Sequence, residues 1–453
     1  MTEQTVPVAQ LRDSVKGKVL LPGDEGYDEA RVVYLGGMDQ RPAAIVQPAN
    51  SDDVSQVVLL AAQSGVPLAI KGGGHSVFCL TDGGIVLDMS SLRELEIDTE
   101  SRTAWADAGL TAGEYTTAAH EHGLVTGFGD TGSVGLGGLT TGGGIGYLAR
   151  KHGLTVDDLL AADIVTADGT VRRIDADNEP ELFWAVRGGG GNFGVLTRMQ
   201  FRLHELTTVT GGLLVLPGTP EVLASFVDLL RDAPDELTSI INVMPGAVLP
   251  FVPEEAQAGL VVMAMMVFAG EGEPADAALA PFRALATPYA DMIAPMPYPA
   301  VYPPEDPDHH PVAAARNLFV DAFDQDTATL VLDRIKESTA MMTAVQIRVL
   351  GGALARSTTD TAFAHRTRPI MVNLAAIYGD PAEEPTHLAF VDRLTKELQK
   401  GAPGVYANFL ADDSEERIRE AYPDATWDRL RAVKRQYDPQ NVFRVNNNIP
   451  PAE

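Results

Sequence analysis

Cysteine is nearly absent from this sequence, which holds only Cys79 among its 453 residues. A single cysteine excludes a framework of internal disulfides, and it excludes a metal site made of several thiolates. Both exclusions favour a reducing compartment. We therefore expect a cytoplasmic protein whose chemistry uses no metal ion.

Long apolar runs are missing as well. The longest, Leu260 to Ala269, has ten residues, whereas a membrane-spanning helix needs about 20. We predict a buried strand there and no association with a membrane. The first residues, MTEQTVPVAQLRDSVKG, show no basic start followed by an apolar core, so we also expect no secretory signal.

Basic residues are scarce: 34 Lys and Arg stand against 62 Asp and Glu, which gives a formal net charge of −28 at pH 7. Binding to nucleic acid requires clustered positive charge, so we expect no nucleic-acid partner. The length and the hydrophobic content of 45% exceed what one core accommodates. At least two lobes are expected.

Between about residues 40 and 205 the sequence alternates short apolar runs with helical patterns. The alternation predicts an α+β fold for this half. A helix is expected to be N-capped by Ser51 and closed by Gly65, and Thr111 with Glu114 forms a capping box for another. Strands are expected at 43–47, 67–70, 85–89 and 195–203, and a hairpin over 162–174 turns at 167–169.

After about residue 206 longer apolar strands alternate with amphipathic stretches, such as Pro220 to Arg231 and Pro274 to Leu285. We interpret this half as a second lobe. The proline-rich passage from Pro295 to Pro311 predicts a surface loop near the site.

Glycine is concentrated in three tracts: residues 72–74, residues 132–146, and residues 188–191 with Gly194. One such tract on its own is more simply a tight turn. Three together predict a cradle, because residues without Cβ let several backbone N–H groups converge on an anion such as a pyrophosphate. We therefore expect the protein to bind a dinucleotide cofactor.

The spacing Gly189-x-Gly191-x-x-Gly194 matches the G-x-G-x-x-G pattern of nicotinamide enzymes, but its context is wrong. That pattern must follow a strand and open a helix, whereas here a helical stretch precedes the glycines and a strand follows them. The loop from Lys71 to Ser76 is not a nucleotide-hydrolysing P-loop either, since no G-K-S/T closes it.

Four motifs occur in order along the chain: PLAIKGGGHS (67–76), VGLGGLTTGGGIG (134–146), LFWAVRGGGGNFG (182–194) and YDPQNVFRVNNNI (437–449). Together they resemble the berberine-bridge-enzyme-like flavoproteins, which have an FAD-binding domain of the vanillyl-alcohol-oxidase type. The resemblance covers nearly the whole chain. It implies a two-lobed α+β fold, with an FAD-binding domain over 1–205 that is completed by 412–453. A substrate domain over 206–411 would hold an antiparallel sheet covered by helices.

The resemblance implies that His75 bonds covalently to the 8α carbon of FAD, and a neutral imidazole is a competent nucleophile for that role. The alternative is a histidine that only caps its loop. Many relatives add a second link from a cysteine where this chain has Thr131, so a single link is expected, and Cys79 is interpreted as structural. The other expected cofactor contacts are Lys71, Gly72, Gly73, Gly74, Ser76, Asp130, Thr131, Val134, Gly135, Gly137, Gly138, Gly142, Gly143, Gly144, Gly146, Asn192, Gly194, Val195, Asn446 and Asn448.

For catalysis the resemblance points to Tyr406, in a Y-x-N segment, as the base that removes a substrate proton. The alternative is a tyrosine that packs between the lobes. Asn373 and Tyr378 on the central strands of the second lobe are further catalytic candidates. His365 and Arg366 match a recurring segment of the family and are expected to serve the fold.

We predict an oxidase that acts on a small amine or alcohol and passes electrons to O2, which becomes hydrogen peroxide. A dehydrogenase or a tailoring cyclase on the same scaffold is the nearest alternative, and a flavin-binding protein without catalysis is another. An amine can react without an enzymatic base, whereas an alcohol requires one. The sequence does not decide between them, nor does it give the oligomeric state.

Overall fold

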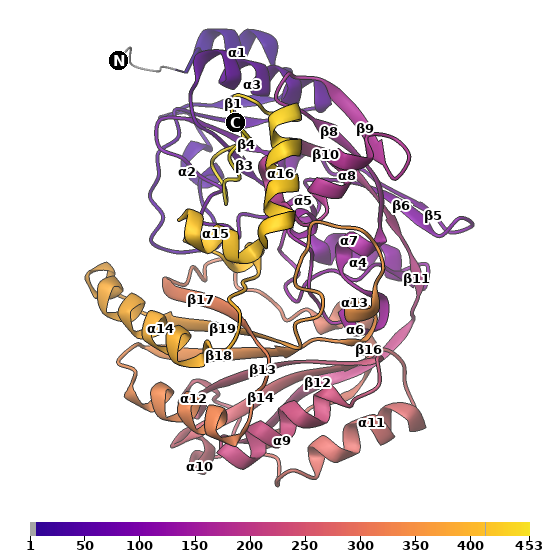
Figure 1. Ribbon diagram of the computed structural model, residues 1–453, viewed down its shortest axis with the longest axis vertical. Helices are drawn as coiled ribbons and strands as arrows, with labels where there is room; N and C mark the ends of the chain where they lie inside the picture. Colours follow the sequence, from indigo (N-terminus) through magenta and orange to yellow (C-terminus); the bar gives the residue numbers. More distant parts are fainter. Residues whose placement is uncertain (1–5, 413) are drawn as a thin grey trace.

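The structure is a computed structural model that describes residues 6–412 and 414–453. Its first lobe, upper in Figure 1, contains a four-stranded sheet of order β1-β2-β4-β3, in which β2, β4 and β3 are parallel, and a five-stranded antiparallel sheet of order β5-β6-β10-β8-β9. The strands of the first sheet are β1 (Lys18–Leu20), β2 (Ala44–Gln47), β3 (Leu68–Lys71) and β4 (Ile85–Asp88). Those of the second are β5 (Leu95–Asp98), β6 (Thr103–Asp107), β8 (Leu159–Val165), β9 (Val171–Asp175) and β10 (Val195–Arg202). A short pair, β7 (Leu124–Val125) and β11 (His204–Glu205), lies beside them.

The helices of the first lobe are α1 (Val8–Ser14), α2 (Tyr27–Ala30), α3 (Ser51–Ser64), α4 (Ala112–His120), α5 (Leu136–Thr141), α6 (Ala149–His152), α7 (Thr155–Asp158) and α8 (Pro180–Val186). The predicted strands, the hairpin of β8 and β9, and the capping box at Thr111 are confirmed. One prediction is wrong in detail: the N-cap of α3 is Asn50, whose side chain accepts from Asp53 N, and Ser51 is the first helical residue. Gly65 closes α3 in the left-handed conformation, as predicted.

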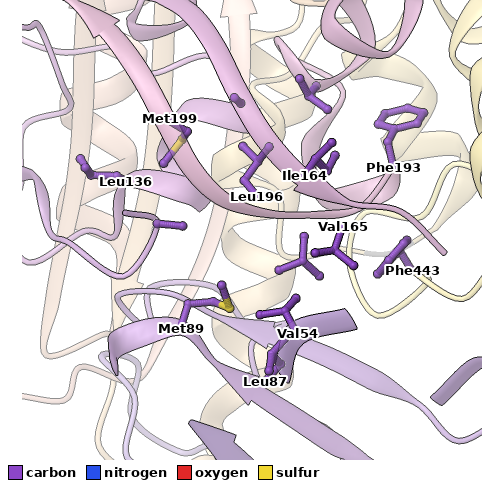
Figure 2. Packing of buried hydrophobic residues seen from close by; sticks show 14 of the residues in the cluster. Val54, Leu87, Met89, Leu136, Ile164, Val165, Phe193, Leu196, Met199 and Phe443 are labelled. Carbon is purple, nitrogen blue, oxygen red and sulfur yellow. The ribbon is translucent and has the colours of Figure 1, made fainter. Parts of the chain in front are cut away.

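One apolar core joins the two sheets of the first lobe. Val54 of α3 and Leu87 of β4 belong to the same buried cluster as Val165 of β8 and Leu196 of β10. Figure 2 shows these side chains packed between the strands, with Phe443 from the end of the chain beside them. The C-terminal segment is therefore a part of this core.

The second lobe is one large antiparallel sheet of order β15-β12-β14-β13-β18-β19-β17, with β16 also paired to β12. Its strands are β12 (Thr208–Pro217), β13 (Leu237–Pro245), β14 (Leu260–Phe268), β15 (Ala290–Asp291), β16 (Ala294–Pro297), β17 (Ala313–Val320), β18 (Met342–Val349) and β19 (Ile370–Ile377). Its helices are α9 (Pro220–Arg231), α10 (Glu254–Gln257), α11 (Glu273–Arg283), α12 (Gln325–Glu337), α13 (Gly352–Arg356) and α14 (Glu384–Leu398). The amphipathic stretches from Pro220 and Pro274 are the helices α9 and α11, and the apolar run from Leu260 is a buried strand, as predicted.

Helices α9, α11, α12 and α14 cover one face of this sheet, while the other face is directed toward the first lobe (Figure 1). Alternate residues of each strand follow this division. Val372, Leu374 and Ala376 of β19 pack in the core beneath the helices, so Met371, Asn373 and Ala375 lie on the face toward the first lobe.

The proline-rich passage is only partly a loop. Residues 294–297 form the edge strand β16, which pairs with β12, and Tyr298 to Val301 form a 3₁₀ turn in which Tyr298 is fully buried. An edge strand tolerates proline because one side of its backbone has no ladder partner. The remainder, from Tyr302 to Pro311, has the expected irregular and mostly exposed form.

The chain returns to the first lobe at its end through α15 (Glu415–Ala421) and α16 (Asp424–Tyr437). Lys434 of α16 is fully buried, pairs with Asp438 at 2.7 Å, and donates to the carbonyls of Asn192 and Phe443 at 2.8 Å. Val405, Ala407 and Leu410 already belong to the core of the first lobe. We therefore propose that the returning segment begins near residue 405, with the domain boundary near 205 as predicted. Among the described helices, none has the length and apolar character that crossing a membrane requires.

Candidate cofactor and active site

His75 lies in the loop that follows β3, where two glycine tracts meet. A Cβ on Gly73 would lie 2.4 Å from both Gly135 N and Ser133 O, closer than any side chain tolerates. Only glycine at position 73 therefore allows the two loops to touch. The contact brings Ser133 beside His75.

The imidazole of His75 is held on two sides. Its ring stacks on Tyr34, with ring centroids 4.3 Å apart and planes inclined by 20°. Its Nε2 atom lies 2.7 Å from Ser133 Oγ. Burial lowers the pKa of His75, against the opposing effect of Glu305 and Asp130, so the ring is neutral near pH 7 and one nitrogen keeps a free lone pair.

Ser133 in turn contacts Glu305, which comes from the proline-rich passage of the second lobe. The Glu305 carboxylate accepts from Ser133 N at 3.0 Å and from the Ser133 hydroxyl. The proline-rich passage therefore reaches the loop beside His75, where the sequence predicted the site. Glu305 itself was not predicted, because one glutamate in an acidic loop carries no local signal.

Gly138 leaves open space above the backbone of its helix. It lies in helix α5, where glycine costs about 1 kcal/mol relative to alanine, yet a Cβ there would meet no atom within 4 Å. Gly72 and Gly191 are nearly as open, with nearest atoms 3.8 and 4.0 Å from an added Cβ. A ligand therefore has room to approach the backbone closely at these positions.

Other predicted cofactor glycines are required by the packing of the protein itself. A Cβ on Gly142, Gly144 or Gly146 would meet Asn408 Oδ1, Thr155 Oγ1 or Phe128 O at 1.8, 2.1 or 1.6 Å. The same holds for Gly143, Gly194 and Gly135, whose added Cβ would meet Phe363, Ile164 and Gly73. Gly74 has a φ of +74° and leads the chain into His75. Gly137 differs from these glycines, because a Cβ added there would lie 3.6 Å from Ala108 Cβ, which is an ordinary contact.

The remaining residues of these loops lie around the glycines. Lys71 donates to Ala30 O at 2.7 Å and faces Asp88 at 3.6 Å, so its ammonium is used within the fold. Ser76 Oγ accepts from Phe78 N at 3.1 Å, and Val134 O accepts from Ala112 N at 2.9 Å. Thr131 is half-buried between Asp130 and Ser133.

The asparagines of the tail meet the third glycine tract. Asn446 Nδ2 donates to Gly191 O at 3.2 Å. Asn192 donates to Asn447 O at 3.1 Å and accepts from Ile449 N at 2.9 Å, which ties the tail to the loop. Gly194 and the buried Val195 follow as β10 begins.

The side-chain oxygens of Asn446, Asn447 and Asn448 are buried and have no partner among the described residues. Buried acceptors without donors are costly. FAD carries ring N–H and hydroxyl groups that can satisfy them, and its diphosphate suits the open backbone at Gly138 and Gly191. The residues present therefore fit FAD.

Tyr406 lies at the boundary of the two lobes and is 3% exposed. Its hydroxyl oxygen accepts from Gly144 N at 3.0 Å and from Asn408 Nδ2 at 2.9 Å. Asn317 Oδ1 accepts from the backbone N of Tyr406 at 2.6 Å. Burial raises the pKa of Tyr406, and the two N–H donors and Arg348 oppose this without overcoming it. The Tyr406 hydroxyl is therefore protonated near neutral pH in the protein alone.

Asn373 belongs to a row of four carboxamides on the face of the sheet toward the first lobe. The strand register places Asn242, Gln346, Asn373 and Asn317 side by side on β13, β18, β19 and β17. Gln346 Nε2 donates to Asn242 Oδ1 at 3.2 Å, and Asn317 connects the row to Tyr406. We call these four residues the amide row.

Tyr378 does not reach this face. It lies in the core beneath the helices and stacks on His387 of α14, with ring centroids 5.0 Å apart. Five positions separate it from Asn373, and an odd separation along an extended strand directs two side chains to opposite faces. The prediction that both act in catalysis is wrong for Tyr378.

Arg348 was not predicted, although a lone arginine in the apolar run of β18 is a visible signal. It is 4% exposed, lies on the same face as the amide row, and pairs with Asp130 of the first lobe at 2.5 Å. Its guanidinium lies 4.9 Å from the ring centre of Phe409. Its Nε and Nη1 atoms have no partner among the described residues.

His365 and Arg366 serve the fold, as expected. His365 Nε2 lies 2.8 Å from Glu420 O, and Arg366 pairs with Asp157 at 2.6 Å. Cys79 is buried, and burial raises the pKa of its thiol to about 11, which agrees with a structural role.

A family model described as an FAD binding domain matches residues 42–175, and a second, described as berberine and berberine like, matches residues 405–450. The chain is thus a flavoprotein by both its fold and its loops. It is 30% identical to (R)-6-hydroxynicotine oxidase of Paenarthrobacter nicotinovorans, over 97% of each chain. The chain belongs to the berberine-bridge-enzyme-like family of FAD-linked oxidoreductases.

Solved structures agree with this assignment. The 6-hydroxy-D-nicotine oxidase of Arthrobacter nicotinovorans superposes with a TM-score of 0.87 at 28% identity, over 97% of this chain and 99% of the other. A glucooligosaccharide oxidase of Acremonium strictum, described with a 6-S-cysteinyl, 8α-N1-histidyl FAD, has a TM-score of 0.84 at 22% identity, over 98% and 99% of the chains. The second likeness shows the fold alone.

Proposed function

We propose that the chain is an oxidase that removes two electrons from a small amine or alcohol, with one FAD joined covalently to His75 and no second link. The relatives named above are oxidases, and His75 occupies a glycine loop that leaves its ring neutral and stacked. The presence of Thr131 at the position of the second link supports a single bond.

When bound, FAD supplies the electron acceptor, which takes a hydride equivalent at N5 and passes two electrons to O2 to give hydrogen peroxide. The protein holds and orients the substrate. The amide row offers donors and acceptors without a charge, so it suits a small neutral molecule with hydrogen-bonding groups. Arg348, two positions from Gln346 on β18, adds two N–H donors beside the row that have no partner among the described residues.

The observation that carries the proposal is the hydrogen-bonding of Tyr406. Its oxygen already accepts from Gly144 and Asn408, so its own proton is left to point elsewhere, and it has no acceptor among the described residues. A phenol held in this way accepts a substrate proton once it is ionised, because both donors stabilise the phenolate. Tyr406 is therefore the base that we propose for an alcohol substrate.

Anaerobic mixing with a panel of secondary amines, heterocyclic alcohols and oligosaccharides tests this function. A substrate bleaches the yellow flavin absorbance, and admission of O2 restores it within seconds with one hydrogen peroxide for each turnover. Reoxidation over minutes would identify a dehydrogenase instead. A colourless purified protein would contradict every flavoenzyme assignment.

The covalent link has its own test. In the wild type, yellow flavin fluorescence is expected to stay with the denatured polypeptide on a gel. In His75→Ala the flavin is expected to be released by denaturation. An adduct that survives in His75→Ala would refute the assignment of His75.

A further inference from the structure

We propose that Glu305, acting through Ser133, holds His75 in the tautomer and position from which it bonds to FAD. The inference rests on the covalent attachment proposed above. It makes Glu305 and Ser133 positioning residues, one contributed by each lobe.

The direction of each hydrogen bond follows from the groups present. Glu305 is an exposed carboxylate, which only accepts, and it contacts both the N–H and the hydroxyl of Ser133. The single hydroxyl proton of Ser133 is therefore given to Glu305, because a bond to an ionised acceptor is the stronger one. The Ser133 oxygen is left as an acceptor toward His75.

His75 must then carry its proton on Nε2, which lies 2.7 Å from that oxygen. The Nδ1 atom keeps its lone pair and has no hydrogen-bond partner among the described residues. The stacked ring of Tyr34 fixes the plane of the imidazole. The contacts of Ser133 and Tyr34 thus make Nδ1 the nucleophilic nitrogen of His75.

Attachment of the flavin to His75 is a two-electron oxidation. One C–H bond at the 8α carbon and the N–H bond of His75 break, a C–N bond forms, and two protons and two electrons pass to O2 as hydrogen peroxide. The proton on Nε2 is the one that the imidazole loses. It leaves along Ser133 toward Glu305, an acceptor that is already hydrogen-bonded in place.

Glu305→Gln tests the proposal because the glutamine side chain has the same shape as glutamate but carries an N–H donor in place of one of its two oxygen acceptors. The glutamine oxygen has to accept from Ser133 N, so its amide nitrogen faces the Ser133 oxygen and donates to it. The Ser133 proton then turns to His75 Nε2, and the imidazole proton moves to Nδ1. We expect the appearance of acid-stable flavin to slow about 100-fold, the lower range for loss of a positioned proton acceptor.

Ser133→Ala removes the connection itself and is expected to slow attachment to a similar degree. Ser133→Thr keeps the hydroxyl and is expected to match the wild type. Asp308→Asn removes the same charge three residues from Glu305, on an exposed side chain, and is expected to change nothing. Acid-released flavin is measured alongside, since a positioning role leaves total FAD unchanged.

Wild-type rates of attachment in both Glu305→Gln and Ser133→Ala would overturn the proposal. A second measurement covers the case in which these variants retain no FAD. Acid hydrolysis of the wild-type holoprotein releases a histidyl flavin, which we expect to be joined through Nδ1. A bond through Nε2 would overturn the proposal, whereas a wild type without acid-stable flavin would contradict the proposed function instead.

Discussion

Tyr406 is the residue whose surroundings say most about the chemistry. It receives two N–H donors at a buried oxygen, and burial still raises its pKa. Burial keeps the Tyr406 hydroxyl protonated near neutral pH. The two N–H donors stabilise the phenolate once it forms. A proton acceptor of this kind works best when the solution is alkaline.

Tyr406→Phe is expected to slow flavin reduction by an alcohol about 10²- to 10⁴-fold, the usual contribution of a positioned base. The wild-type rate is expected to rise as the solution becomes alkaline, because the raised pKa of Tyr406 leaves little phenolate near neutral pH, and the variant is expected to lose this rise. Stopped-flow absorbance under anaerobic conditions measures both. Reduction of a neutral amine, which needs no base, is expected to be nearly unaffected.

Tyr378→Phe makes the same chemical change on the opposite face of the sheet. We expect it to leave the reduction rate and its pH profile unchanged. If Tyr406→Phe behaves like Tyr378→Phe with an alcohol, then Tyr406 is not the base.

At the scale of elements, a stacked histidine pair joins α6 to β11. His152 and His204 have ring centroids 3.9 Å apart, and His204 Nε2 lies 2.8 Å from Asp158. Burial, with the nearby His204 and Lys151, lowers the pKa of His152 to about 3. In the unfolded chain His152 therefore binds a proton near pH 6.5, whereas in the folded protein it stays neutral at that pH.

The sign of the effect on stability follows from this difference. Between about pH 6.5 and pH 3 the unfolded state binds more protons at His152, so acidification lowers the free energy of unfolding by up to about 1.4 kcal/mol per pH unit. His152→Phe keeps a stacked ring and is expected to remove this part of the slope. Urea titrations at pH 6, 5 and 4 measure it.

His309→Gln provides the comparison, since His309 is exposed in the segment that follows Tyr302. It is expected to leave the pH dependence of unfolding unchanged. An unchanged slope in His152→Phe would show that another group dominates acid unfolding in this range.

The elements that sequence patterns predicted are those whose signals are local. The helix over 220–231, the capping box at Thr111 and the hairpin of β8 and β9 depend on residues within a few positions of one another. β16 was missed because its prolines argue against a strand unless the strand is known to lie at an edge. The misplaced Tyr378 was avoidable, since counting from Asn373 gives an odd interval.

The candidate site was predictable only where motifs carry it. The motifs located His75, the glycine loops, the tail asparagines and Tyr406. Glu305, Ser133 and Arg348 act through contacts that span the two lobes, with 172 positions between Ser133 and Glu305. No local sequence pattern predicts these contacts, because they form only when the second lobe packs against the first.

At the scale of the whole molecule, Asp130 and Arg348 hold the lobes together over the site. Arg348 is almost fully buried, so it depends on Asp130 for a counter-charge. Asp130→Asn is expected to lower the free energy of unfolding by about 3 kcal/mol, because it leaves a buried cation without a partner. Calorimetry or urea unfolding of the flavin-loaded protein measures the loss.

Asp235→Asn breaks a more exposed ion pair with Arg356 and is expected to cost less than about 1 kcal/mol. The double variant Asp130→Asn with Arg348→Met is expected to recover part of the loss, since no unpaired charge remains. Equal costs for Asp130→Asn and Asp235→Asn would show that solvent reaches Arg348.

The polypeptide crosses between the lobes twice, once after β11 and once before Tyr406. The second lobe is therefore an insertion in the first, and the chain connects it to the first lobe at both of its ends. A protease that nicks one crossing leaves the two halves joined by the other. A hinge motion of the second lobe would have to bend both crossings together, and it would also have to pull Ala362, from the loop after α13, out of the core of the first lobe.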